Sequence, residues 1–259
     1  MRREARNIRR AIGVGLAATT LLLATGRALA DSATIAVAAN FLAPLEALEP
    51  LFEEATGHEL VLVAGSTGQL YAQIVNGAPF DVLLSADAEH AQRLVADGLA
   101  EAPTRFTYAV GRLALWTRDG ERFAPLGVET LRRSDYRWLA IANPELAPYG
   151  LAAQQTLTKL GLWDSLQSRI VRGQSIAQTF AMAETRNADL GLVALSQVIT
   201  YQDVAAYFEI PPELHAPLRQ DAVLLARAHD NAAARAFVAW LRNTPGAAEV
   251  VASFGYAKP

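Results

Sequence analysis

The sequence predicts a two-lobed α/β fold, with mixed, mostly parallel sheets that are flanked by helices and joined by two crossover strands. Three observations predict this class. Short apolar runs alternate with amphipathic segments along almost the whole chain, as in β-α-β units. Most runs are continuously apolar, which is typical of strands covered by helices on both faces. A glycine follows most amphipathic segments, where helices commonly end.

The apolar runs place the predicted strands at 33–38, 59–64, 81–85, 106–117, 138–142, 169–172, 189–194, 204–209 and 221–227. The run 106–117 is long for one strand, so we expect it to begin in one sheet and end in another. A second crossing is expected within 214–224. With these two crossings, one lobe comprises residues 31–107 plus 219–259, and the other comprises residues 108–218.

Amphipathic stripes predict helices between these strands. The first helix covers 44–56, where Leu45, Leu48 and Phe52 share one face and Gly57 ends the helix. The remaining stripes are Leu70 and Ile74 before Gly77, Ala91, Leu94 and Val95 before Gly98, Leu157 and Leu160 before Gly161, and Phe237, Trp240 and Leu241 near the C-terminus. In such a fold, ligands bind beyond the carboxyl ends of the strands, between the lobes.

Residues 1–30 have the features of a cleaved signal peptide. Five arginines lie within the first ten residues, and residues 11–26 are apolar or small. This run is short for a membrane span, and a short membrane anchor is the alternative interpretation. The segment 28–30 matches a small-x-small cleavage site, so we expect cleavage after Ala30 and a periplasmic location. The arginine pair at 9–10 leaves the general secretory and twin-arginine routes both open.

The composition excludes several classes of function. The chain has 259 residues and a formal net charge of −3. Without the leader, which holds six Arg and one Glu, 17 basic and 25 acidic residues remain, a charge of −8. An acidic domain without a basic run is not expected to bind nucleic acid or an anionic membrane surface. The absence of Cys excludes disulfides, thiolate metal sites, Cys nucleophiles and a lipoprotein anchor.

Two strand-to-helix turns, 26 positions apart, carry a small neutral side chain that can form hydrogen bonds. Asn40 follows the predicted strand 33–38, and Ser66 follows the predicted strand 59–64. Free backbone N–H groups and the positive end of the helix dipole make such a turn a site for anions. Each side chain can instead be a plain N-cap. Since neither turn contains Lys or Arg, the pair predicts a small anion held by neutral donors.

Two later junctions repeat this arrangement in the second lobe. Tyr149 lies just before a predicted helix over 151–160, and its phenol either points at a ligand or covers the loop. Ile176 begins a helix after the predicted strand 169–172, so its backbone N–H is a free first-turn donor. The alternative is that Ser175 at this junction is only a capping residue.

The sequence contains no pattern of catalytic or metal-binding residues. The four histidines do not pair at the spacing of metal ligands. Ser66 is not within a Gly-x-Ser-x-Gly turn, and Asp87 is expected to cap a helix or to pack between the lobes. We therefore expect no catalytic residue, and an exported α/β hydrolase is the alternative from another class.

Several stretches of the chain, within residues 33–256, resemble the periplasmic molybdate-binding proteins of molybdate ABC transporters. These stretches are 35–41 (IAVAANF), 64–68 (AGSTG), 76–87 (NGAPFDVLLSAD), 142–150 (ANPELAPYG), 160–164 (LGLWD) and 191–194 (GLVA). Each stretch alone is weakly specific, but their order and spacing together are typical of this family.

The resemblance implies a type II periplasmic-binding-protein fold that holds an oxyanion between its lobes. The implied donors are the side chains of Asn40, Ser66 and Tyr149 and the backbone N–H of Ile176, with Ala39 and Thr67 as additional backbone or side-chain donors. One departure is Ala194, where some members supply a Tyr hydroxyl, which Tyr149 would replace from another direction. The resemblance also implies a monomer without a cofactor, no direct protein ligand to molybdenum, and an ABC permease in the inner membrane as partner.

The chemistry of the oxyanions gives an expectation for selectivity. Molybdate and tungstate are tetrahedral dianions without a proton near neutral pH, so a site for them needs donors only. Phosphate keeps a proton there and would leave it unpaired, at a cost of about 1–3 kcal/mol. Sulfate is also fully ionised, so only cavity size can exclude it. The alternatives are a receptor for another oxyanion such as sulfate, or for a small organic acid, whose carboxylate would recruit an Arg such as Arg105 or Arg172.

Overall fold

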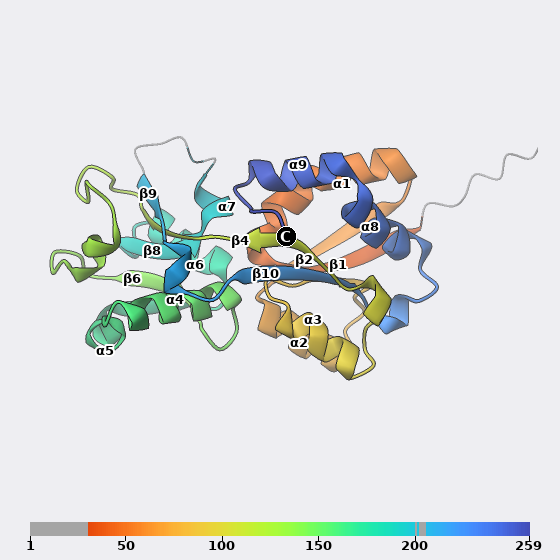
Figure 1. Ribbon diagram of the computed structural model, residues 1–259, viewed down its shortest axis with the longest axis horizontal. Helices are drawn as coiled ribbons and strands as arrows, with labels where there is room; N and C mark the ends of the chain where they lie inside the picture. The colour runs from red at the N-terminus through yellow and green to blue at the C-terminus, as the bar shows by residue number, and fades with distance from the viewer. Residues whose placement is uncertain (1–30, 200, 202–205) are drawn as a thin grey trace, which may run out of the picture.

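The computed structural model describes residues 31–199, 201 and 206–259, and Figure 1 shows them as two α/β bodies side by side. The predicted leader, residues 1–30, and the start of the predicted strand 204–209 lie outside the described residues. Each body is built on a five-stranded sheet with helices packed against it. This arrangement confirms the predicted two-lobed α/β class.

The first sheet has the strand order β2 (Glu59–Gly65), β1 (Ser32–Ala38), β3 (Val82–Leu84), β10 (Leu218–Leu224) and β4 (Phe106–Gly111). β1 is parallel to β2 and β3, and β10 is antiparallel to β3 and β4. Within this sheet β10 is thus the one reversed strand. In β1, Ile35 and Val37 face one helical layer and Ala36 faces the other, which is why this run is apolar throughout.

The second sheet has the strand order β7 (Ile170–Gly173), β6 (Leu139–Ala142), β8 (Leu190–Ala194), β5 (Leu113–Thr117) and β9 (Ala206–Glu209). β6 is parallel to β7 and β8, whereas β5 is antiparallel to β8 and β9. The reversed strand of this sheet is therefore β5. Both sheets are mixed and mostly parallel, as predicted.

The chain crosses between the two sheets at neighbouring positions. The long apolar run 106–117 is divided as predicted, because β4 ends at Gly111 and β5 begins at Leu113. The return crossing precedes β10, which begins at Leu218 and lies entirely in the first sheet. Gly111 pairs with Leu218, so the two passages lie side by side.

Helices cover both faces of each sheet. Around the first sheet lie α1 (Leu42–Thr56), α2 (Thr67–Val75), α3 (Glu89–Ala96), α8 (Ala232–Asn243) and α9 (Pro245–Ser253), and around the second lie α4 (Pro148–Lys159), α5 (Trp163–Leu166), α6 (Ile176–Glu184) and α7 (Leu195–Val198). Short 3₁₀ turns are η1 (Ala39–Phe41), η2 (Ala102–Thr104), η3 (Val128–Arg132), η4 (Gln167–Arg169), η5 (Pro212–Leu214) and η6 (Ala226–Ala228). Within the described part of the chain, none of the helices combines the length and apolar character of a membrane span.

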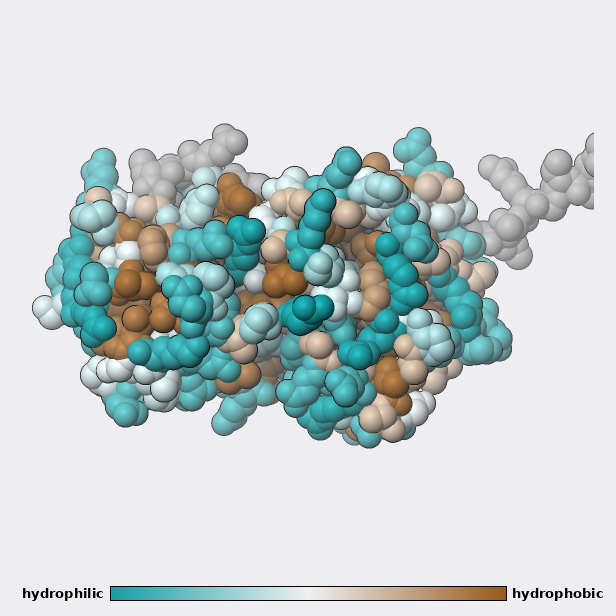
Figure 2. All heavy atoms as spheres, viewed as in Figure 1, coloured by the Kyte–Doolittle hydropathy of each residue, from teal (hydrophilic) through white to brown (hydrophobic). Residues whose placement is uncertain are grey.

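Clusters of buried apolar side chains hold the helices on the sheets. One cluster lies between the first sheet and α1, α8 and α9, and another lies between that sheet and α2 and α3. The second sheet packs against α4 and α5 on one face and around Trp116 on the other. Hydrophilic side chains cover most of the face shown in Figure 2. This packing fixes the strand ends that face the space between the bodies.

Candidate anion-binding site

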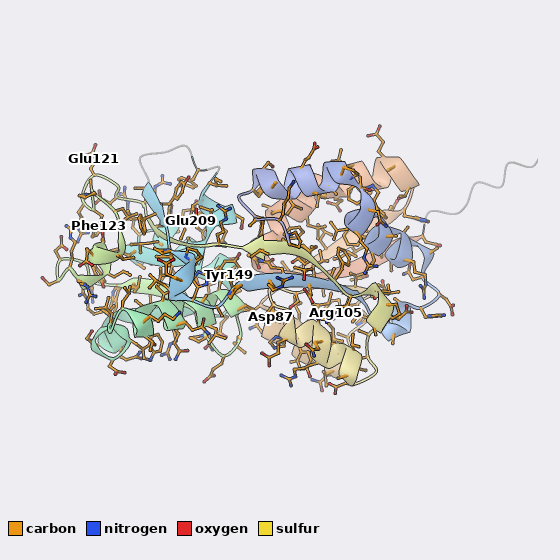
Figure 3. The ribbon with its side chains drawn as sticks, viewed as in Figure 1. Asp87, Arg105, Glu121, Phe123, Tyr149 and Glu209 are labelled. Carbon is orange, nitrogen blue, oxygen red and sulfur yellow. The ribbon has the colours of Figure 1, made fainter. Side chains whose placement is uncertain are left out.

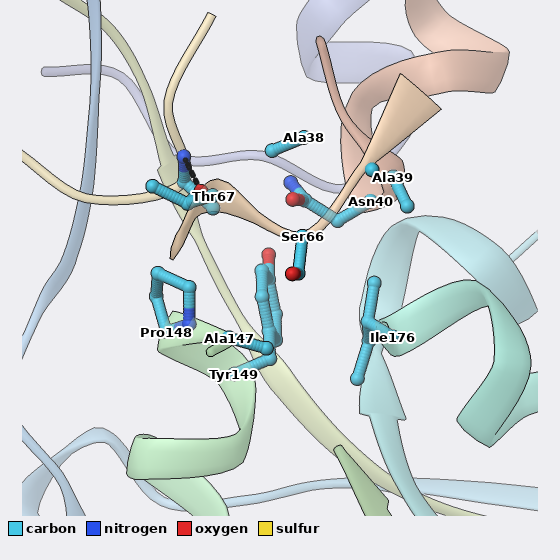
Figure 4. A pocket seen from close by; sticks show the side chains of 11 residues that line it. Ala38, Ala39, Asn40, Ser66, Thr67, Ala147, Pro148, Tyr149 and Ile176 are labelled. Carbon is cyan, nitrogen blue, oxygen red and sulfur yellow. Dashed lines mark hydrogen bonds between the residues drawn. The ribbon is translucent and has the colours of Figure 1, made fainter. Parts of the chain in front are cut away.

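A small cavity lies between the two bodies, beyond the carboxyl ends of parallel strands (Figure 4). Its lining consists of Ala38, Ala39, Asn40, Gly65, Ser66, Thr67, Ala86, Ala147, Pro148, Tyr149 and Ile176. The structure thus brings together all six residues that the sequence predicted as donors. No charged side chain is among these lining residues.

Three helices direct their N-termini at the cavity, α2 from the first body and α4 and α6 from the second. Their first residues, or the residues just before them, are part of the lining: Ser66, Thr67, Ala147, Pro148, Tyr149 and Ile176. The first N–H groups of a helix lack intrahelical partners, and its N-terminus carries a partial charge of about +0.5. Their convergence creates a positive potential without Lys or Arg, which suits an anion.

Ser66 supplies a hydroxyl that is buried and free. The residue precedes α2 with extended backbone angles (φ −75°, ψ 149°), which is the position of a capping residue. Its Oγ makes no hydrogen bond with any described residue, although Ser66 is only 3% exposed. Its backbone N–H donates to Gln69 Oε1 at the long distance of 3.5 Å. Because an unpaired buried hydroxyl costs about 1–3 kcal/mol, an acceptor in the cavity would relieve this cost.

The first turn of α2 also brings the two bodies into close contact. Thr67 Oγ1 accepts the backbone N–H of Ala86 at 2.9 Å, so its own proton is not used in that bond (Figure 4). Gly68 donates its backbone N–H to the Leu146 carbonyl, in the loop before α4, at 2.9 Å. A Cβ at position 68 would lie 2.9 Å from the same oxygen. Glycine is therefore required for this approach of one body to the other.

Asn40 does not cap a helix, so the plain N-cap interpretation is wrong. It lies within η1, and neither η1 nor α1 has a side-chain capping bond. Its amide nitrogen instead donates to Gln220 Oε1 and to Tyr256 Oη, each at 2.9 Å. The turn after β1 directs the side chain toward β10 and the C-terminal segment, where these two acceptors lie. Both amide hydrogens are thus engaged within the protein.

Gln220 connects Asn40 to Tyr149. It lies in β10 and is fully buried. Its Nε2 donates to Tyr149 Oη at 3.2 Å, and its Oε1 also accepts from Tyr108 Oη at 3.1 Å. Tyr149 is 1% exposed, and its ring extends from the start of α4 toward Ser66 (Figure 4). Figure 3 shows it near the middle of the molecule, between the two sheets.

Two further polar residues, which the sequence did not single out, complete this hydrogen-bond network. Tyr256 Oη donates to the backbone carbonyl of Asn40 at 2.7 Å. Ser196, in α7 of the second body, donates its hydroxyl to the same carbonyl at 2.9 Å. Gln220 had only a weak signal in the sequence, because its neighbours Arg219 and Asp221 in β10 are polar as well. Tyr256 and Ser196 had none, since they approach Asn40 from remote parts of the chain.

The buried phenols near the cavity keep their protons at neutral pH. Burial raises the pKa of Tyr149 well above its ordinary value, the nearby Tyr256 hydroxyl raises it further, and the hydrogen bond from Gln220 opposes the shift. Burial likewise raises the pKa of Tyr108 well above its ordinary value and that of Tyr256 to about 12. These hydroxyls therefore remain neutral donors and do not add negative charge that would repel an anion.

Ile176 begins α6, as predicted, and lines the cavity. Ser175 caps the helix, because its hydroxyl accepts the backbone N–H of Gln178 at 3.3 Å. This capping bond satisfies a different N–H group and is compatible with a donor role for the Ile176 backbone. Ala194 stands where some molybdate-binding proteins have a Tyr. It is fully buried and is not part of the cavity lining.

The charged residues considered in the sequence lie away from the cavity. Arg105 pairs with Asp221 at 2.8 Å, and Arg172 donates to Gln167 at 3.2 Å. Asp87 caps α3, since it accepts the backbone N–H of His90 at 2.9 Å. Among the described residues, no group of three or more His, Cys, Asp or Glu could hold a metal ion. The cavity therefore offers hydrogen-bond donors and helix dipoles rather than charges.

Comparison with known proteins gives the family. The model of the family described as bacterial extracellular solute-binding protein matches residues 33–257, almost the whole described chain. The chain belongs to this family.

Two curated relatives cover nearly the full length of the chain. The molybdate-binding protein ModA of Azotobacter vinelandii is 44% identical over 250 residues, which are 95% of each chain. ModA of Rhodobacter capsulatus is 43% identical over 242 residues, which are 92% of this chain and 94% of the relative. The resemblance found in the sequence to molybdate-binding proteins is thus confirmed.

A solved structure agrees with this assignment. The periplasmic molybdate-binding protein of Azotobacter vinelandii matches with a TM-score of 0.83 and 39% identity, covering 88% of this chain and 99% of its own. The sulfate-binding protein SubI of Mycobacterium tuberculosis matches with a TM-score of 0.73 but only 16% identity, covering 87% of this chain and 86% of its own. The second likeness shows the fold alone.

Proposed function

We propose that this protein is an exported receptor that captures molybdate, and also tungstate, in the cavity between its two bodies. The observation that carries the proposal is a cavity whose lining has no charged residue, with three helix N-termini and the free Ser66 hydroxyl directed into it. The identity to molybdate-binding relatives over nearly the full length supports the same ligand.

Neutral donors explain both the affinity and the selectivity of such a receptor. A hydrogen bond to a charged group contributes about 1.5–3 kcal/mol, so several together hold a dianion without an ion pair. The proposed donors are the hydroxyls of Ser66, Thr67 and Tyr149 and the backbone N–H groups near Ala39 and Ile176, with Asn40 orienting its neighbours. Phosphate would bring a proton for which the lining offers no carboxylate acceptor, so we expect phosphate to be rejected.

The same geometry supports a role in transport rather than in catalysis. The cavity lies between two bodies that are connected at Arg112 and before Leu218, so a rotation about these passages would open it. We propose residues 31–107 plus 219–259 and residues 108–218 as the two moving lobes. An ABC permease would receive the oxyanion from the opened monomer, and neither a cofactor nor a reaction is needed. Export would follow cleavage after Ala30.

Calorimetric titration of the protein with molybdate, tungstate, sulfate and phosphate tests the proposal. Molybdate and tungstate are expected to bind with similar affinity and phosphate not to bind. Sulfate binding as tight as that of molybdate would refute the selectivity, because cavity size would then not discriminate. A double variant, Asn40→Ala with Ser66→Ala, is expected to bind molybdate much more weakly. Unchanged affinity in this variant would show that the oxyanion binds elsewhere.

A further inference from the structure

We infer that Gln220 is a positioning residue that makes Tyr149 a donor to the cavity. The inference rests on the proposed function and assigns a role to a residue that does not line the cavity. A tyrosine hydroxyl can donate or accept, so a phenol beside an oxyanion helps only if its proton points inward.

The direction is set by a chain of hydrogen bonds that begins at a backbone carbonyl. The Asn40 carbonyl can only accept, and it accepts from Tyr256 Oη at 2.7 Å. Having donated its one proton, Tyr256 accepts from Asn40 Nδ2 at 2.9 Å. If Tyr256 donates instead to Ser196 Oγ, at 3.1 Å, Ser196 donates to the same carbonyl at 2.9 Å and the direction is unchanged. The Asn40 amide must therefore present its nitrogen, not its oxygen, to Tyr256.

The orientation of Asn40 then fixes the orientation of Gln220. The second hydrogen of Asn40 Nδ2 is donated to Gln220 Oε1 at 2.9 Å, so that end of the Gln220 amide is the acceptor. Tyr108 Oη also lies 3.1 Å from Oε1. The opposite end, Nε2, donates to Tyr149 Oη at 3.2 Å. Tyr149 thus accepts from Gln220, and its own proton is left for the neighbouring Tyr256 hydroxyl or, when an oxyanion is bound, for an acceptor in the cavity.

The backbone is shaped to permit this contact. A Cβ at Gly111 would lie 2.2 Å from Tyr149 Oη and 2.5 Å from Gln220 Nε2. Gly111 is the last residue of β4, beside the point where the chain crosses to the second sheet. Gln220 and Tyr149 come from different bodies, so their hydrogen bond connects the two bodies beside the crossing.

A mutant cycle tests whether Gln220 acts through Tyr149. Gln220→Met keeps the volume but cannot donate, and Tyr149→Phe removes the hydroxyl. Each variant is expected to lower molybdate affinity about 10- to 100-fold, the effect of one hydrogen bond to a charged group. The double variant is expected to bind molybdate no more weakly than the single variant with the lower affinity. If the losses of affinity in the two single variants instead multiply in the double variant, the inference is overturned. Thermal melting of each variant verifies that it is folded.

A charge variant gives a second readout that a merely structural role would not produce. In Gln220→Glu the ionised carboxylate accepts only, so the Tyr149 proton turns away from the cavity and affinity falls. Lowering the pH protonates the introduced carboxylate, whose pKa burial should raise, and the affinity should recover. In the Tyr149→Phe background this recovery should shrink about tenfold. An equal recovery in both backgrounds would leave only charge repulsion and overturn the inference.

The controls separate this inference from the proposed function. Gln155→Glu makes the same change in α4, where the side chain accepts the backbone N–H of Ala216 at 2.9 Å and does not line the cavity. It is expected to bind molybdate within twofold of wild type at every pH. Wild-type protein that binds none of the oxyanions would overturn the proposed function and this inference together. Wild-type binding with a pH-independent, fully active Gln220→Glu variant would overturn this inference alone.

Discussion

Gly68→Ala is expected to weaken oxyanion binding without weakening the fold. A Cβ at position 68 would lie 2.9 Å from the Leu146 carbonyl oxygen and 3.2 Å from Leu146 Cα. Ordinary contacts begin at 3.4 Å, so the two bodies would have to separate by about 0.5 Å. This shift lengthens the hydrogen bond between Gly68 and Leu146, now 2.9 Å, and moves the start of α2 away from α4.

The magnitude follows from the contacts that such a shift removes. Weakening one hydrogen bond from the protein to a charged ligand costs about 1.5–3 kcal/mol, which is about 10- to 150-fold in affinity. In the open form of the protein, the added Cβ at position 68 does not clash with Leu146. In addition, Ala favours a helix over Gly by about 1 kcal/mol. The free energy of unfolding of the ligand-free protein should therefore not fall by more than the loss of a single hydrogen bond.

Calorimetric titration with molybdate, together with thermal melting of the ligand-free protein, measures both effects. Gly246→Ala is the matched control, because position 246 lies in the first turn of α9 and a Cβ there meets nothing within 4 Å. This control should bind as wild type does and should melt at the same or a slightly higher temperature. A Gly68→Ala variant with an affinity within twofold of wild type would refute the reasoning.

Three other perturbations have defined outcomes. Ser66→Ala should lower molybdate affinity about 10- to 100-fold in calorimetry but leave the melting temperature nearly unchanged, since its hydroxyl has no protein partner to lose. A large loss of stability would show that this hydroxyl is structural. Burial raises the pKa of Tyr149 well above its ordinary value and raises the pKa of Tyr256 to about 12, above the ordinary value of about 10. The stabilisation by these neutral phenols should be complete below about pH 10 and lost as the pH rises toward 12, which denaturant titrations across pH would measure; a loss that begins near neutral pH would contradict it. Arg105→Gln should lower the free energy of unfolding by about 1–3 kcal/mol, because buried Asp221 loses its charged partner and keeps only the hydrogen bond from Thr107, yet leave molybdate affinity unchanged; reduced affinity would favour an arginine-assisted site.

The sequence predicted the fold because its signals are local. Continuous apolar runs such as 139–142 and the glycines after helices mark the elements directly. The length of 106–117 was enough to predict the first crossing. The strand β10 was harder, because Gln220 and Asp221 interrupt its apolar pattern and the predicted start fell three residues late, at 221 instead of Leu218.

The candidate site was predicted in part for the same reason. Ser66, Tyr149 and Ile176 stand at strand-to-helix junctions, which sequence patterns reveal. The partners of Asn40 could not be predicted, because Gln220 and Tyr256 are separated from it by 180 and 216 positions. Only the folded chain brings these side chains together. The sequence therefore shows where donors stand but not which way their protons point.

The absence of charged groups from the cavity lining has a consequence for how binding can be detected. The charge of a dianion bound in this cavity is not compensated by a cationic side chain of the lining. The lining also has no carboxylate or imidazole that could take up a proton when the dianion binds. The loaded protein should carry two more negative charges and migrate faster toward the anode in a native gel. For the same reason, the enthalpy of binding should not depend on the ionisation heat of the buffer.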